Sequence, residues 1–211
     1  MATTHTWLLK PGYRLEIVKQ LLASSSNIVI ASCRKPDEAT ELKELEIKSP
    51  GRLHLVTLDI LDGASIKASM EGENTAFEVD EDSFSRTLKS NVVGPALTAQ
   101  AYLPYLEKGT KKTIVNISSA LGSLAVIFDS RYAAYSASKA ALNMLTQKQA
   151  KARKDIISIS LDPGWVQTDM GGPNADIKPQ VSVGGLLKVI TTATPEKSGK
   201  YIRYTGEELA W

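Results

Sequence analysis

Short apolar runs alternate with amphipathic stretches along the whole chain. Several of the short runs are rich in β-branched residues and almost continuously apolar, which is typical of parallel strands covered on both faces. Short strand-like runs that alternate repeatedly with helical segments are typical of a parallel sheet with crossover helices. The sequence predicts strands at residues 6–9, 27–32, 53–57, 113–118, 156–161 and 200–204.

Between these runs, apolar residues recur at helical spacing with charged residues on the opposite side. The pattern predicts helices at residues 15–23, 38–47, 82–103 and 132–153. No internal repeat, low-complexity tract or linker divides the chain, so we expect a single α/β domain over residues 1–211.

One interval lacks a clear strand. After the strand that ends near Thr57, the chain runs through a helical stretch at 64–70 and then through residues 71–80 into the next helix. A parallel crossover must return to the sheet, and the one strand-like segment here is the weak run at 75–79.

Composition narrows the class of protein. The chain has 211 residues, of which 43% are hydrophobic and 23% are charged, and its 25 basic and 23 acidic residues form no strong block. This balance argues against a dedicated nucleic-acid or membrane-surface protein and favours small-molecule chemistry. One cysteine, Cys33, the lack of an apolar leader and the short apolar runs predict a soluble, cytoplasmic protein. His5 and His54 are isolated, so no metal site is expected.

Tyr135 and Lys139 are the first candidates for chemistry. Residues four positions apart on a helix share one face, so the ammonium can lie near the phenol and favour its ionised form. An unperturbed phenol titrates near ~10 and needs such a cation to exchange protons at neutral pH. The pair is common by chance, so its context must support it.

The context is favourable. An Asn-Ile-Ser-Ser segment, residues 116–119, stands at the carboxyl end of a strong predicted strand and precedes the helix that carries Tyr135. A Pro163-Gly164 turn follows the next strand. Ligand sites of parallel α/β sheets lie at the carboxyl ends of the strands.

With Asn91 in Lys-Ser-Asn-Val-Val-Gly, these motifs make the chain resemble the short-chain dehydrogenase/reductase family, specifically its carbonyl-reductase-like branch of single-domain Rossmann proteins. The resemblance covers most of the chain. It implies a Rossmann-like, doubly wound parallel sheet. The matching residues are Asn91, Ser118, Ser119, Tyr135, Lys139 and the segment 163–168.

The resemblance also implies roles for these residues. Tyr135 would give a proton to the carbonyl oxygen as the hydride arrives, and Ser119, or failing it Ser118, would hold that oxygen by a hydrogen bond. Lys139 would lower the pKa of the tyrosine and bind the nicotinamide ribose. Asn91 would hold a water molecule that links Lys139 to solvent.

The same resemblance predicts NADP (NADPH) as the cofactor. Arg34 follows the second strand, where a basic residue favours the 2′-phosphate of NADP. Asp59 would lie near the adenine, and Thr168 would contact the nicotinamide amide. The complete set of expected cofactor-binding residues is Arg34, Asp59, Tyr135, Lys139, Pro163, Gly164, Val166 and Thr168.

Two family signatures are missing. Residues 9–14 replace the glycine-rich phosphate turn, and Pro11 has no N–H to offer a phosphate. The family's Asn-Asn-Ala-Gly segment and the central strand before it should lie between Met70 and Glu73, where the chain has neither. We therefore expect a sheet that lacks one central strand relative to the family, with its edges paired again or covered.

Three hypotheses follow. The first is an NADP-dependent oxidoreductase that reduces a carbonyl, or oxidises an alcohol, of a small molecule with Tyr135 as acid and base. The second is a catalytically inactive homologue with a binding or assembly role, and the third is a truncated form of a full-length enzyme. Residues 121–131 and 169–174 are expected to form an apolar substrate pocket with a lid. A homodimer would pack through the helices at 82–103 and 132–153.

Overall fold

The computed structural model describes residues 5–9, 14–33, 35–57 and 75–211. These residues fall into two units, which are described separately. Unit 1 takes its residues from 1–59 and 179–184, and unit 2 from 60–178 and 185–211.

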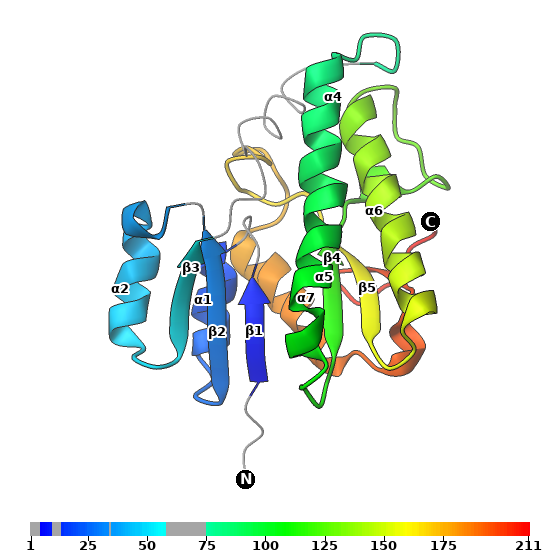
Figure 1. The fold of residues 1–211 in the computed structure, drawn as a ribbon. Helices are drawn as coiled ribbons and strands as arrows, with labels where there is room; N and C mark the ends of the chain where they lie inside the picture. Colours follow the sequence, from blue (N-terminus) through cyan, green and yellow to red (C-terminus); the bar gives the residue numbers. More distant parts are fainter. Residues whose placement is uncertain (1–4, 10–13, 34, 58–74) are drawn as a thin grey trace. The chain divides into compact units, whose positions relative to one another are not determined.

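Unit 1 is built on a three-stranded parallel sheet of order β1-β2-β3 (Figure 1). Alternating burial along β2, with Val29 and Ala31 fully buried, gives the sheet an apolar face toward Val18 and Leu21. Arg52 donates one hydrogen bond to the carbonyl of Leu22, the last residue of the first helix, and another to the Ser24 carbonyl in the turn that follows. Its elements are β1 (His5–Leu9), α1 (Arg14–Leu22), β2 (Asn27–Cys33), η1 (Pro36–Glu38), α2 (Thr40–Lys48) and β3 (Leu53–Thr57).

Unit 2 contains a second parallel sheet of order β4-β5-β6. Every residue of the central strand β5 is buried, because helices cover both faces of the sheet. Its elements are α4 (Glu81–Leu88), η2 (Lys89–Val93), α5 (Gly94–Leu106), β4 (Thr113–Ile117), η3 (Ala120–Gly122), α6 (Ala133–Ala152), β5 (Ile157–Asp162), α7 (Pro179–Thr192, of which residues 179–184 belong to unit 1), η4 (Pro195–Lys197) and β6 (Tyr201–Arg203).

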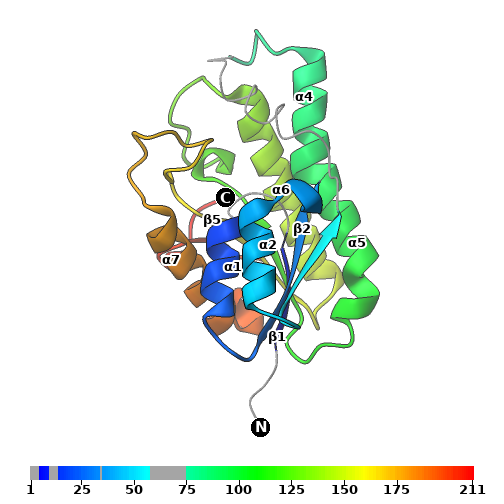
Figure 2. The ribbon, with the colours of Figure 1, turned by 90° about the vertical axis from the view of Figure 1, so that its left-hand side faces the viewer.

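The core of unit 2 lies between its sheet and the last turns of α7. Ile159, Leu161 and Ile202 pack with Leu186 and Ala193, all at most 6% exposed. Leu142 and Thr146 of α6 are also buried, and α6 packs against β4 and β5. Figure 2 shows α5 and α7 on opposite sides of the sheet of unit 2. Burial on both faces explains why the small polar residues Ser158 and Ser160 of β5 are as fully buried as its apolar residues.

All six predicted strands are confirmed within one or two residues at their ends. The predicted helix at 82–103 is instead two α-helices joined by the π-helical segment η2. The helix α7 was not predicted, although Pro179 at its first turn and Val183 and Leu186 at helical spacing carry the usual signals. Among the described residues, no helix is both long and apolar enough to cross a bilayer.

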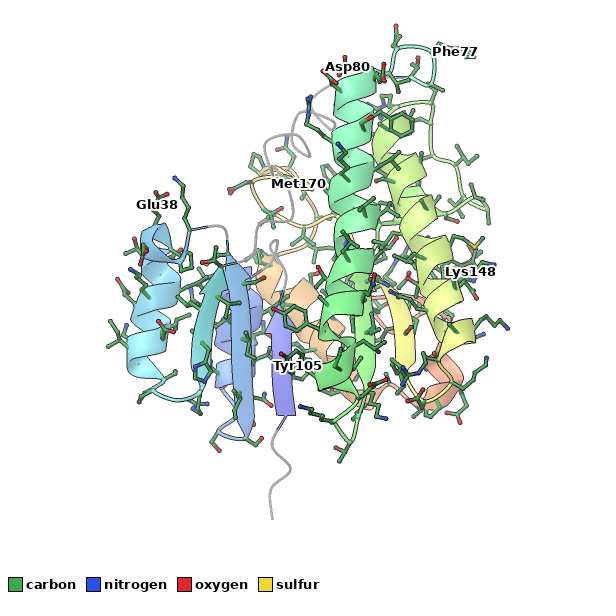
Figure 3. All side chains as sticks on the ribbon, viewed as in Figure 1. Glu38, Phe77, Asp80, Tyr105, Lys148 and Met170 are labelled. Carbon is green, nitrogen blue, oxygen red and sulfur yellow. The ribbon has the colours of Figure 1, made fainter. Side chains whose placement is uncertain are left out.

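The predicted weak strand at 75–79 is wrong. The Glu78 amide donates to the Thr75 carbonyl in a tight turn, and the Thr75 hydroxyl donates to the Glu78 carboxylate. Phe77, the residue that a strand would have to bury, is fully exposed and lies in the loop before α4 in Figure 3. These local hydrogen bonds satisfy polar groups of the segment without the backbone hydrogen bonds that a strand would make to a neighbour. In the described part of the chain, β1 and β4 each pair with one strand, so each is an edge of its sheet.

Candidate active site

The candidate site of unit 2 lies at the carboxyl ends of its parallel strands. Ser118 and Ser119 follow β4, and Pro163 and Gly164 follow β5. The Ser118 amide donates to the Leu161 carbonyl at 2.7 Å, which continues the ladder past the end of β4 and keeps the two segments together. This is the edge at which parallel sheets place their ligands.

Helix α6 presents Tyr135 and Lys139 on its buried face. The helix begins after Tyr132, whose left-handed φ of 58° turns the incoming loop into the helix. The Lys139 Nζ lies 5.4 Å from the centroid of the Tyr135 ring and donates to the Ile117 carbonyl at 2.8 Å. The ammonium is therefore held between the tyrosine and the end of β4, as the i, i+4 spacing predicted.

Asn91 reaches the same helix from η2. Its side-chain amide donates to the Ser138 hydroxyl at 2.9 Å, and that hydroxyl donates to the Tyr135 carbonyl at 2.7 Å. All three residues are buried. A π-helical turn widens the helix locally and is frequent at functional sites. Asn91, Tyr135 and Lys139 are thus brought together, and Ser138 is the link that the sequence motif did not identify.

Ser119 begins the short turn η3. Its hydroxyl accepts a hydrogen bond from the Leu121 amide at 3.3 Å. The turn lies directly against α6, because a Cβ on Gly122 would stand 2.7 Å from the Cβ of Lys139. The Ser118 hydroxyl is buried beside the Tyr201 hydroxyl but makes no hydrogen bond of good geometry with any described residue.

The Pro163-Gly164 turn has a fixed shape. Gly164 has φ of 75°, and a Cβ there would come within 2.4 Å of the Ile177 side chain. Val166 is buried and forms a bridge with Ile177, which holds the turn from the other side. The Thr168 hydroxyl donates to the Val166 carbonyl at 3.3 Å and accepts from the Gly171 amide at 3.1 Å. The predicted Pro163, Gly164, Val166 and Thr168 therefore form one ordered loop.

Sequence reasoning missed three polar residues at this edge of the sheet. Asp162 is 2% exposed and forms an ion pair with Arg203 at 3.3 Å. Tyr201 is 1% exposed, and its hydroxyl donates to the Ser119 carbonyl. A charged residue between the predicted strand at 156–161 and the Pro163-Gly164 turn was the available signal for Asp162.

Two predicted residues, Arg34 and Asp59, lie outside the described residues, as do positions 10–13 of the altered phosphate turn and the whole interval 58–74. The predicted site residues that the structure does describe all belong to unit 2.

The loop at 121–131 lines a cavity of about 230 Å³. From α6 it takes Ala133, Ser136, Ala137 and Ala140. An α-helix turns by about 100° per residue, so this face is a different one from the face that carries Tyr135 and Lys139. The predicted loop thus forms an apolar cavity, and the face of α6 that lines it is not the face that carries Tyr135.

Comparison with known proteins shows which proteins this chain resembles. Residues 57–178 match the short chain dehydrogenase family. The C-signal protein of Myxococcus xanthus is 40% identical over 136 residues, which cover 64% of this chain and 82% of that protein. An uncharacterized oxidoreductase of Schizosaccharomyces pombe is 31% identical, with 95% of this chain and 94% of the relative covered. That alignment spans 239 positions, more than the 211 residues here, so the relative has residues where this chain has none.

Solved structures give the same result. The NADPH-bound carbonyl reductase from chicken fatty liver superposes with a TM-score of 0.88 at 33% identity, with 100% of both chains covered. The carbonyl reductase Sniffer of Drosophila melanogaster superposes with a TM-score of 0.87 at 26% identity, also over 100% of both chains. The chain therefore has the Rossmann-like α/β fold that the sequence predicted.

Proposed function

The chain belongs to the short chain dehydrogenase family of oxidoreductases, and on that premise we propose that it reduces the carbonyl, or oxidises the alcohol, of a small molecule with NADP as cofactor. The observation that carries this proposal is the buried pairing of Tyr135 and Lys139 at the carboxyl end of β4. The NADPH in the related carbonyl reductase supports the choice of cofactor.

Each of these residues has a different role in proton transfer. The Tyr135 hydroxyl gives its proton to the substrate oxygen during reduction and takes it back during oxidation. The Lys139 ammonium, 5.4 Å from the ring, favours the phenolate that remains after proton donation. The Ser119 hydroxyl holds the substrate oxygen, and Asn91 keeps a proton path open toward solvent beside α6. NADPH, when bound, supplies the hydride.

The donor set suits the nicotinamide half of this cofactor. An ammonium from Lys139 and a hydroxyl from Thr168 both lie at the strand ends, and such donors are suited to ribose hydroxyls and to an amide oxygen. Tyr135, Pro163, Gly164 and Val166 complete this part of the proposed cofactor site. Arg34 and Asp59, which would bind the adenosine half, lie outside the described residues.

Turnover tests this function directly. We expect the purified protein to oxidise NADPH with some members of a panel of aromatic and aliphatic aldehydes and ketones, followed by the loss of reduced nicotinamide absorbance. NADPH oxidation without any carbonyl is the blank. No substrate-dependent rate with any panel member, in protein that binds no NADPH by calorimetry, would favour the inactive homologue instead.

Arg34 should set the preference between the two nicotinamide cofactors. In Arg34→Ala we expect KM for NADPH to rise roughly tenfold or more, because a charge-assisted bond to the 2′-phosphate contributes about 1.5–3 kcal/mol. KM for NADH should stay within about twofold. Lys35→Ala is the matched control, since Lys35 is exposed and already paired with Glu38 at 2.8 Å. An equal rise for both cofactors would assign Arg34 another role.

We also propose that residues 1–211 act as one domain and that two copies pair through α5 and α6. Large apolar side chains are exposed on these helices, among them Leu97 at 59%, Tyr105 at 68% and Met144 at 58% (Figure 3 labels Tyr105). Exposed apolar groups of this kind mark surfaces that associate. The cytoplasmic setting stays a prediction from the sequence.

A further inference from the structure

The peptide group that joins Ser119 to Ala120 is held at both of its polar atoms by side chains. Its carbonyl accepts from the Tyr201 hydroxyl, and its N–H donates to the Asp162 carboxylate at 3.2 Å. The two side chains come from different strands, 82 and 42 residues farther along the chain. With both ends bonded, this peptide plane cannot rotate without breaking a partly buried hydrogen bond.

Asp162 joins two parts of the site. The same oxygen, Oδ1, that accepts from Ala120 also accepts from the Gly164 amide at 3.1 Å. This one carboxylate oxygen therefore bonds both the turn after Ser119 and the Pro163-Gly164 turn. The first turn carries the hydroxyl proposed for the substrate, and the second carries the loop proposed for nicotinamide.

A buried carboxylate is costly unless it is paired, and this one is paired fully. Its other oxygen, Oδ2, accepts from Arg203 Nε at 3.3 Å, and Arg203 also contacts Glu207 at 3.2 Å. Tyr201 and Arg203 stand two positions apart on β6, so both side chains project from the same face of that strand. The short strand β6 thus presents one donor to Ser119 and another to Asp162.

Tyr201 acts here as a donor rather than as an acid. Burial, with a further contribution from the Asp162 carboxylate, raises the pKa of the Tyr201 phenol well above its ordinary value. The hydroxyl therefore keeps its proton through the pH range in which an enzyme is assayed. The ring also stacks on Trp211, with centroids 5.4 Å apart, which fixes the direction of the hydroxyl.

We propose that Asp162 and Tyr201 are positioning residues that clamp the Ser119–Ala120 peptide, and that Asp162 sets the spacing between the catalytic turn and the Pro163-Gly164 turn. The clamp rests on the proposed function, because it acts through Ser119 and not on the substrate itself. It keeps the Ser119 hydroxyl where the substrate oxygen must be held, and small displacements of such a group cost large factors in rate.

Three variants test the clamp through kinetics. Tyr201→Phe keeps the stacked ring and removes one hydroxyl, so we expect kcat to fall roughly tenfold with KM for NADPH within about twofold. Asp162→Ala releases both turns, so kcat should fall and KM for NADPH should rise, each roughly tenfold or more. Asp162→Asn keeps an acceptor oxygen and should restore at least half of the loss on a logarithmic scale. Tyr204→Phe, whose hydroxyl bonds no described residue, is the matched control and should change neither constant.

Amide hydrogen exchange gives a readout that needs no turnover. Asp162→Ala should speed exchange at both Ala120 and Gly164, whereas Tyr201→Phe should speed it at Ala120 alone. If the unaltered protein shows no turnover, the proposed function fails, and these two amides still decide whether Asp162 joins the turns. Unchanged exchange at both amides in Asp162→Ala would overturn the clamp. So would a loss of kcat in Tyr201→Phe that Tyr204→Phe reproduces.

Discussion

Replacing Tyr135 by phenylalanine is expected to lower kcat by roughly 10²- to 10⁴-fold, the usual contribution of a positioned acid or base. The change removes the hydroxyl that we propose exchanges a proton with the substrate and leaves the ring beside Lys139 in place. Because Tyr135 is buried on α6 and its ring is kept, the fold should survive. Steady-state kinetics with the best carbonyl of the panel, together with a thermal unfolding curve, measure both effects.

Tyr105→Phe is the matched control for this prediction. Tyr105 lies on α5 and is 68% exposed, so the loss of its hydroxyl should leave kcat unchanged. A Tyr135→Phe enzyme that keeps kcat within threefold of the unaltered protein would remove Tyr135 from the chemistry. The oxidoreductase would then have to use another proton donor.

The second large effect is expected from Gly122→Ala. The new methyl group would stand 2.7 Å from Lys139 Cβ and 2.8 Å from the Lys139 carbonyl carbon, and neither atom can move without moving α6. The turn η3 must therefore move away from the helix, which strains the hydrogen bond from Asn143 to the Gly122 carbonyl. We expect a loss of about 1–3 kcal/mol in the free energy of unfolding. We also expect a fall in kcat, because Ser119 and Lys139 are separated.

Urea unfolding measures the first effect and steady-state kinetics the second. Gly184→Ala is the control, because the nearest atom to its new methyl group is the Gln20 Oε1 at 3.6 Å. An alanine within a helix such as α7 should raise the free energy of unfolding by about 0.5–1 kcal/mol relative to glycine. If Gly122→Ala unfolds no more easily than Gly184→Ala, the close packing of η3 on Lys139 does not contribute to the free energy of unfolding.

Local pattern was enough for most of the fold. The strands β2, β4 and β5 all contain β-branched residues, which fit the pleated, buried surface of a sheet. The weak run at 75–79 misled the prediction because its apolar residues are few and Thr75 and Glu78 bond to each other. The π-helical turn at Lys89–Val93 has no local signature that would separate it from the helices on either side.

Part of the candidate site could also be predicted from local sequence, and part could not. Tyr135 and Lys139 are one helical turn apart, so the sequence by itself determined that they share a face. The family motifs likewise led to Asn91, Ser119 and the loop after Pro163 from the residues alone. These conclusions need local spacing or motif identity, and both are present in the chain as written.

Only the tertiary structure decided what surrounds those residues. The Ser119 peptide meets Asp162 and Tyr201 because β4, β5 and β6 end at the same edge of one sheet, across 42 and 82 residues of chain. No local pattern encodes such a meeting, since it depends on strand order and register. The sequence thus specified the candidate catalytic groups, and the packing of three parallel strands specified which other side chains hold them.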